Sequence, residues 1–227
     1  MVRTLEGLVI AIPAAATATG SAVAGLIAAE QGELILGAQT TTQLQSVERS
    51  IQPGEISYPV QVDIEQAKSV DEFFKIAIAQ FGRIDAIVLE TKFPKRSTLI
   101  EKSIGSGVRR LLYCLDAALR YCSGDLHIVT ISPGADRYAI PVANAFLGGR
   151  LATRKTAASP ALTVRMSVVS LVDRASSENG TLARTVLHVL RETRNVDVTE
   201  AVLWQQPEQQ DKRSRRASAR SKITLPM

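Results

Sequence analysis

The turn at residues 13–20 is the first part of the chain whose residue types and position could do chemistry. It lies between an apolar run at 8–12 and an Ala-rich stretch at 21–31, which predict a strand and a helix. In such a strand–turn–helix unit, backbone N–H groups and the helix N-terminus can bind a pyrophosphate. Pro13 lacks an N–H group, and Gly20 is the turn's one glycine. An ordinary Ala-rich turn that binds no phosphate is an equal alternative.

The cysteines and histidines predict neither a disulfide nor a metal site. Cys114 and Cys122 are eight residues apart in one predicted helix, which separates them by about 12 Å, too far for a bridge. The chain has two histidines and no close pairing of cysteine with histidine, so we expect no zinc site. We therefore expect a protein of a reducing, intracellular compartment.

Short β-branched runs alternate with helical patterns, which predicts right-handed crossovers and one doubly wound parallel sheet of the Rossmann type, covered on both faces. Asp63 is expected to cap a helix that Gly82 ends. The predicted strands are 8–12, 33–37, 56–62, 85–89, 126–131, 162–171 and 201–204, and the predicted helices are 21–31, 42–49, 66–82, 104–122, 142–158 and 181–193.

Composition and charge divide the chain into an α/β domain at 1–207 and a basic tail at 208–227. The chain has 227 residues, of which 45% are hydrophobic and 22% charged, and this balance excludes a wholly disordered protein. The net charge of +5 suggests a polyanion partner, but six basic and two acidic residues of the tail supply +4 of it. We expect the tail to be disordered and the body to bind no nucleic acid.

Targeting signals are sparse. The chain has no apolar run of about 18 residues, so we expect no membrane span. Glu6 precedes the first apolar stretch, where a secretory signal would be basic, and Thr17 and Thr19 interrupt that stretch. A cytoplasmic location is expected. The tail, which contains Arg-Arg-Ala-Ser at 215–218, leaves nuclear import, kinase recognition or polyanion binding as alternatives.

The order and spacing of these elements resemble the short-chain dehydrogenase/reductase family over about residues 4–205. The phrase FGRIDAIV at 81–88 is the most family-like, and LEGLVIAI at 5–12 is the next. The resemblance implies a Rossmann fold and NAD(P) chemistry. The family's glycine motif, TGxxxGIG, falls on residues 13–20. Gly20 is retained there, whereas Ala14 and Ala18 replace the other glycines and add methyl groups where backbone and pyrophosphate should nearly touch.

Other cofactor positions of the family are retained only in part. Asp63 matches the family's Asp that meets the adenine amino group, although a helix cap is the favoured alternative. The stretch 37–42, where the family selects NAD or NADP, contains neither an acid nor an arginine. The family's Asn-Asn-Ala-Gly turn falls on 89–92, and none of the four residues matches. We therefore expect NAD(P) to bind weakly or not at all, with Gly20 and Asp63 as the candidate cofactor-binding residues.

The family's catalytic group is lost in the alignment. Family members use a Ser to orient the substrate carbonyl, a Tyr as the acid/base, and a Lys four residues later to lower the pKa of that Tyr. Here the Ser position falls on Pro133, with Ser132 one residue early. The Tyr position falls on Phe146, which has no proton to transfer, and the Lys position falls on Arg150.

Tyr138 offers an alternative site together with Ser132, which lies six residues before it. The residue four positions beyond Tyr138 is Val142, so no alignment recovers the Tyr-x-x-x-Lys pair. A tyrosine without its lysine titrates near pH 10 and is a poor acid/base at neutral pH. Ser132 and Tyr138 are therefore the candidate catalytic residues, and an ordinary loop tyrosine is the favoured interpretation of Tyr138.

The resemblance also implies a partner. In the family, the helices corresponding to 104–122 and 142–158 pack against a second subunit, although the apolar stripe of the first helix could face the sheet alone. We expect a degenerate, non-catalytic binding or regulatory subunit that pairs with itself or with an active relative. The alternative is an NAD(P)-dependent oxidoreductase of carbonyl or alcohol substrates with a rearranged site. The stripe comprises Val108, Leu111, Leu112, Leu115 and Leu119.

Overall fold

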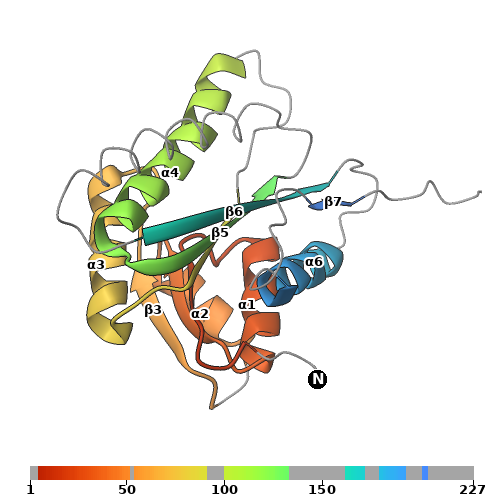
Figure 1. Cartoon of the computed structure of the whole chain (residues 1–227). Helices are drawn as coiled ribbons and strands as arrows, with labels where there is room; N and C mark the ends of the chain where they lie inside the picture. The colour runs from red at the N-terminus through yellow and green to blue at the C-terminus, as the bar shows by residue number, and fades with distance from the viewer. Residues whose placement is uncertain are drawn as a thin grey trace, which may run out of the picture.

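A parallel sheet of seven strands forms the centre of the protein (Figure 1). The computed structural model describes residues 5–51, 54–90, 100–132, 162–171, 179–192 and 201–203. The strand order is β3-β2-β1-β4-β5-β6-β7, and each neighbouring pair is parallel. The order reverses between β1 and β4, which is the switch point of a doubly wound sheet. This arrangement confirms the predicted fold class.

The predicted alternation of strands and helices is present throughout the described ranges. The strands are β1 (Val9–Ile12), β2 (Glu33–Ala38), β3 (Ser57–Gln61), β4 (Ala86–Glu90), β5 (Gly124–Ser132), β6 (Leu162–Leu171) and β7 (Ala201–Leu203), and the helices are α1 (Ala18–Ala29), α2 (Thr41–Glu48), α3 (Ala67–Phe81), α4 (Ile100–Tyr121) and α6 (Asn179–Glu192).

Helices cover both faces of the sheet, with α1 and α6 on one side and α3 and α4 on the other (Figure 1). Neighbouring residues of a strand point to opposite faces, so each central strand supplies both cores. In β2, Leu34 packs on the α1 and α6 side, whereas Ile35 packs with Phe73 and Phe74 of α3. A strand buried on both faces needs a continuous apolar run, which explains the sequence VIAI of β1 and the AIVL at residues 86–89 of β4.

Helix α1 differs from its prediction at both ends. It begins at Ala18 rather than at residue 21, because the hydroxyl of Thr17 accepts a hydrogen bond from the Gly20 amide at 2.9 Å and caps the helix. After the helix, Gln31 has a left-handed backbone with φ of 63°. Gly32 follows without that conformation, and a Cβ atom on it would lie 2.6 Å from Cγ2 of Ile27. Gly32 is therefore required for close packing.

The family-like phrase at 81–88 has a structural explanation. Gly82 ends α3 with φ of 74°, as predicted. The carboxylate of Asp85 accepts a hydrogen bond from the Val9 amide at 2.8 Å and pairs with Arg83 at 3.0 Å. Arg83 also donates to the carbonyl of Gly7. These bonds join the start of β4 to the start of β1, so the phrase contributes to folding at the edge of the sheet opposite the strand carboxyl ends.

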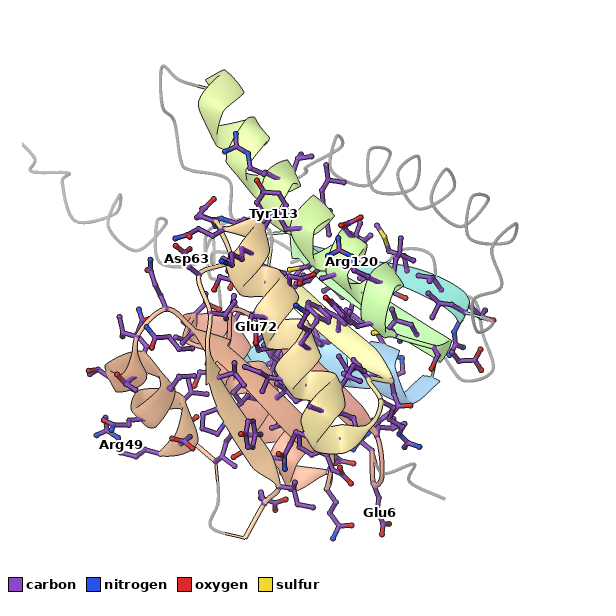
Figure 2. The ribbon with its side chains drawn as sticks, turned by 90° about the vertical axis from the view of Figure 1, so that its left-hand side faces the viewer. Glu6, Arg49, Asp63, Glu72, Tyr113 and Arg120 are labelled. Carbon is purple, nitrogen blue, oxygen red and sulfur yellow. The ribbon has the colours of Figure 1, made fainter. Side chains whose placement is uncertain are left out.

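Polar contacts join α3 to α4 across their exposed surface. The hydroxyl of Tyr121 donates to the carboxylate of Asp71 at 2.8 Å, and Arg120 pairs with Asp71 and with Asp116. Figure 2 shows Arg120 on α4 and Glu72 on α3, the two helices that this network connects. These partners lie about 50 residues apart in the chain, at 71 and 121. The network therefore links α3 to α4 on the outer side of the buried contact between them.

The cysteines agree with their prediction. Cys114 and Cys122 are buried, and neither forms a disulfide. Burial raises the pKa of the Cys114 thiol to about 12, so it stays protonated and unreactive at neutral pH. Within the ranges that the structure describes, no helix is both long and apolar enough to cross a membrane.

A buried histidine joins two of the strands. His127 of β5 lies 2.9 Å from the Ser167 hydroxyl of β6, measured from its Nε2 atom. Burial, reinforced by the positive charge of Arg165, lowers the pKa of His127 to about 4. The imidazole is therefore neutral in the folded protein at pH 7, whereas in an unfolded chain it takes up a proton near pH 6.5.

We predict that acid destabilises the protein through His127. Above pH 6.5 the titration of His127 does not lower the free energy of unfolding. As the pH falls from 6.5 toward 4, this free energy decreases by about 3 kcal/mol in total. Urea unfolding of the wild type between pH 7 and 4 should show this loss, and His127→Gln should remove most of the slope. His188 is exposed, so His188→Gln is the matched control and should keep the wild-type slope. Equal slopes for the two variants would contradict the assignment.

Candidate functional site

A cavity of about 330 Å³ opens at the carboxyl ends of β1, β2 and β3. This is the edge of a doubly wound sheet at which ligands bind. Figure 2 shows Asp63 at the beginning of α3, at the opposite end of the sheet from Glu6. The walls come from the turns after β1 and β3, the end of β2 with the start of α2, and one residue of α4. The lining residues are Pro13, Ala14, Ala16, Thr17, Gly37, Ala38, Gln39, Gln43, Val62, Asp63, Ile64, Glu65 and Arg110.

The turn after β1 rests directly on β2. The amide of Ala15 donates to the carbonyl of Gly37 at 2.8 Å. A Cβ atom on Gly37 would lie 2.5 Å from the carbonyl oxygen of Pro13 and 2.6 Å from Cγ1 of Val62. Only glycine permits this approach. Sequence reasoning missed the role of Gly37, although a glycine at the end of an apolar strand is a signal for close backbone contact.

Several amides of the turn are engaged within the protein. Besides that of Ala15, the amide of Thr17 donates to the carbonyl of Ala14 at 3.4 Å, and the amide of Gly20 donates to the Thr17 hydroxyl. Pro13 has no amide hydrogen. These groups are therefore committed to the turn and the cap of α1, which reduces the number of donors that a phosphate could use.

The three positions of the glycine motif occupy different places. Ala14 lines the cavity, and Ala18 is exposed at the first position of α1. Gly20 is buried, and a Cβ atom on it would lie 2.5 Å from the carbonyl oxygen of Ala14. This contact explains why Gly20 is retained irrespective of any ligand. Its assignment as a cofactor-binding residue stays a prediction.

Asp63 does not cap α3, so that prediction is wrong. The helix begins at Ala67 after Gln66, whose side chain makes no capping bond, because residues 63–66 first form a turn. The Asp63 carboxylate instead accepts hydrogen bonds from the Glu65 amide at 3.0 Å and from the Gln66 side chain at 2.7 Å. These bonds hold the carboxylate at the cavity wall, where each oxygen keeps a lone pair for a ligand.

The loop after β2 presents neutral groups to the cavity. Thr40 and Gln43 form a reciprocal capping box at the start of α2, with bonds of 3.3 and 3.1 Å. Gln39 and Gln43 line the cavity. With neither an acid nor an arginine in this loop, the position that normally distinguishes NAD from NADP carries no charge.

Arg110 is a lining residue that sequence reasoning missed. It extends from α4 and forms an ion pair with Glu65, which follows β3. The pair therefore joins α4 to the turn after β3, which also contributes Asp63 and Ile64 to the lining of the cavity. Arg110 is the one cation among the described lining residues, and Asp63 and Glu65 bring two negative charges. No local sequence pattern signals this pair, because its members are 45 residues apart.

A second space lies between the turn after β1, the end of β4 and α4. A second cavity of about 20 Å³ adjoins the first and is lined by Pro13, Ala14, Ile64, Leu89, Glu90, Arg110, Leu111 and Cys114. This volume is enough for about one water molecule. Glu90 ends β4 and brings a carboxylate to the place where the ligand of a doubly wound sheet crosses from one half to the other.

The candidate catalytic residues are placed only in part. Ser132 is the last residue of β5, so its backbone lies at the same edge of the sheet as the cavity. Tyr138, Phe146 and Arg150 lie outside the described residues. The predicted helix at 142–158 and the tail at 208–227 also lie outside them. Their assignments stay predictions.

We predict that Gly37→Ala destabilises the protein by about 1–3 kcal/mol, because the new methyl group must displace the turn at Pro13. Gly25→Ala in α1 is the matched control, since its Cβ would approach described atoms no closer than 3.5 Å. The control should be neutral or stabilise by up to about 1 kcal/mol through helix propensity. Urea unfolding measures both. A Gly37→Ala variant as stable as the wild type would refute the close contact.

No family model and no curated protein sequence matches the chain. Solved structures do match. A short-chain dehydrogenase from Mycobacterium smegmatis is 19% identical with a TM-score of 0.68, over 89% of this chain and 94% of its own. A metagenomic short-chain oxidoreductase in complex with NADP is 19% identical with a TM-score of 0.63, over 88% and 98%. An alcohol dehydrogenase from the archaeon Thermococcus sibiricus, complexed with 5-hydroxy-NADP, is 23% identical with a TM-score of 0.59, over 88% and 99%. The chain therefore has the fold of the short-chain dehydrogenases/reductases.

Proposed function

We propose that this chain is a degenerate short-chain dehydrogenase/reductase-like protein that does not transfer hydride and acts as a binding or regulatory subunit. The observation that carries the proposal is the state of the turn at 13–20. It keeps the position of a phosphate loop, yet Pro13 has no donor and the amides of Ala15, Thr17 and Gly20 are bonded within the protein. Such a turn holds a pyrophosphate poorly, so NAD(P) binds weakly at most.

The residues suit one half of a dinucleotide better than the other. On the β1–β3 side, a cavity with a fixed carboxylate at Asp63 suits an adenosine group. On the β4 side, Glu90 lines a space for one water. In the alignment, Phe146 and Arg150 stand in place of the acid/base and its lysine. A chain without a proton donor at that point cannot complete a carbonyl reduction by the family's mechanism.

The rival function is an NAD(P)-dependent oxidoreductase with a rearranged site. The observation in its favour is the place of Ser132 at the carboxyl end of β5, where a hydroxyl could orient a substrate carbonyl. Tyr138 would then have to supply the proton. Without a neighbouring lysine its pKa stays near 10, so its activity at neutral pH would be low.

Pairing with a second subunit is part of the proposal. On α4, Leu111 and Leu115 are buried against the sheet, whereas Val108, Leu112 and Leu119 are half-buried. A partner helix packing on this half-buried stripe would complete its burial. The partner is a second copy of this chain or an active relative, packed on 104–122 and 142–158. Sedimentation of the purified chain as a monomer, with no complex on adding an active relative, would contradict this part.

We predict that the purified chain oxidises no NADH or NADPH with a panel of aldehydes and ketones. Its affinity for both cofactors should be weaker than micromolar, as measured by quenching of Trp204 and by nicotinamide emission. Ser132→Ala and Tyr138→Phe are the controls for a contaminating enzyme. Turnover that either substitution abolishes would refute the non-catalytic proposal and establish the rival.

A further inference from the structure

We propose that Pro59 prevents the edge of the sheet at β3 from pairing with the β3 strand of a second copy of this chain. The inference goes beyond the proposed function, because it concerns the edge of the sheet and not the ligand site. Three features support it: the place of β3 at the edge, the outward direction of the backbone groups of Pro59, and the apolar, uncharged sequence around this proline.

The strand β3 forms one edge of the sheet (Figure 1). It pairs with β2 on one side, and among the described strands none pairs with it on the other. An unpaired strand edge presents N–H and C=O groups that can bond to another chain. The strand at the opposite edge, β7, spans three residues, whereas β3 spans five. The edge at β3 is therefore the longer template for the addition of a strand.

The pairing of β3 with β2 sets the direction of its backbone groups. The carbonyl of Ile56 accepts a hydrogen bond from the Leu34 amide at 2.9 Å, and the Val62 amide donates to the Ala38 carbonyl at 2.8 Å. Because alternate residues of a strand direct these groups to the same side, the even-numbered residues from 56 to 62 bond toward β2. The N–H and C=O groups of the odd-numbered residues between them therefore point away from the sheet.

Pro59 occupies the middle of this outward row. Proline has no N–H group, and the donor that it lacks would face away from β2. Pro59 therefore costs the sheet no hydrogen bond, and it keeps its place opposite Leu36 in the register of the two strands. A partner strand laid along the edge would meet a carbonyl at residue 59 without the donor beside it. The central hydrogen bond that the addition of a strand needs is thus removed.

The sequence around Pro59 would otherwise favour pairing. Residues 56–62 read ISYPVQV and contain no charged side chain. Ile56 and Tyr58 are large hydrophobic residues that are 56% and 37% exposed. Segments of about seven residues with high β-propensity, low net charge and no proline are typical of strands that aggregate. The proline is the one feature by which this run departs from that pattern, so the barrier to pairing depends on it.

The substitution Pro59→Val tests the barrier, because it restores the N–H group with a side chain that favours strands. Antiparallel pairing of two β3 edges makes a contact with twofold symmetry, so sedimentation velocity at high protein concentration should show at least about twice the mass of the wild type. Under the same conditions, the amides of Ser57 and Gln61 should exchange with D₂O about tenfold more slowly than in the wild type. Comparison with the wild type makes the result independent of any pairing through α4.

Two further variants separate the missing donor from the added apolar surface. Ser57→Val is the matched control, because it adds the same side chain to the same face of β3 and keeps Pro59, so it should sediment like the wild type. The double variant Ser57→Pro/Pro59→Val moves the proline two residues along the outward row, where again no bond to β2 is lost, and should return to the wild-type mass.

Three results would overturn the proposal. The first is a Pro59→Val variant that has the wild-type mass at every concentration, or a heavier one whose two amides exchange as in the wild type. The second is association of Ser57→Val as strong as that of Pro59→Val. The third is a double variant that stays as heavy as Pro59→Val. Urea unfolding of each variant verifies that the fold is kept.

Discussion

The close contact between the turn after β1 and Gly37 of β2 is the constraint on which the site depends. A Cβ atom on residue 37 would lie 2.5 Å from the carbonyl oxygen of Pro13, and the Ala15 amide donates a hydrogen bond to the Gly37 carbonyl. This contact places the turn over the carboxyl end of β2. It therefore sets two walls of the large cavity and the point at which α1 begins.

Several family-like features of the chain are explained by folding alone. Asp85 joins β4 to β1, Gly82 ends α3, and Gly20 lets α1 begin against the Ala14 carbonyl. These residues are needed whether or not a cofactor binds. The residue types that only a bound cofactor would require are missing. Pro13 and Ala14 occupy the turn after β1, and the loop after β2 carries no charge. The molecule therefore keeps the scaffold of the fold.

The fold could be predicted from the sequence because hydrophobic runs and helical periodicity are local signals. The predicted strand at 162–171 has the observed bounds, and Gly82 ends its helix as predicted. The predicted cap at Asp63 is wrong because a turn separates Asp63 from α3, and the periodicity of the helix does not reveal that turn. The Glu65–Arg110 ion pair could not be predicted, since it exists only when α3 and α4 pack side by side.

A crystal structure of the chain soaked with NAD⁺ tests the central claim most directly, because it reports where each half of the dinucleotide lies. At concentrations high enough to force binding, we expect ordered density for adenosine against Asp63 and none for the nicotinamide half. A fully ordered dinucleotide, with its nicotinamide ring over the carboxyl ends of β4 and β5 near Ser132, would contradict the account. That result would show that the chain still holds the hydride-accepting nicotinamide ring at the place where the family's chemistry occurs.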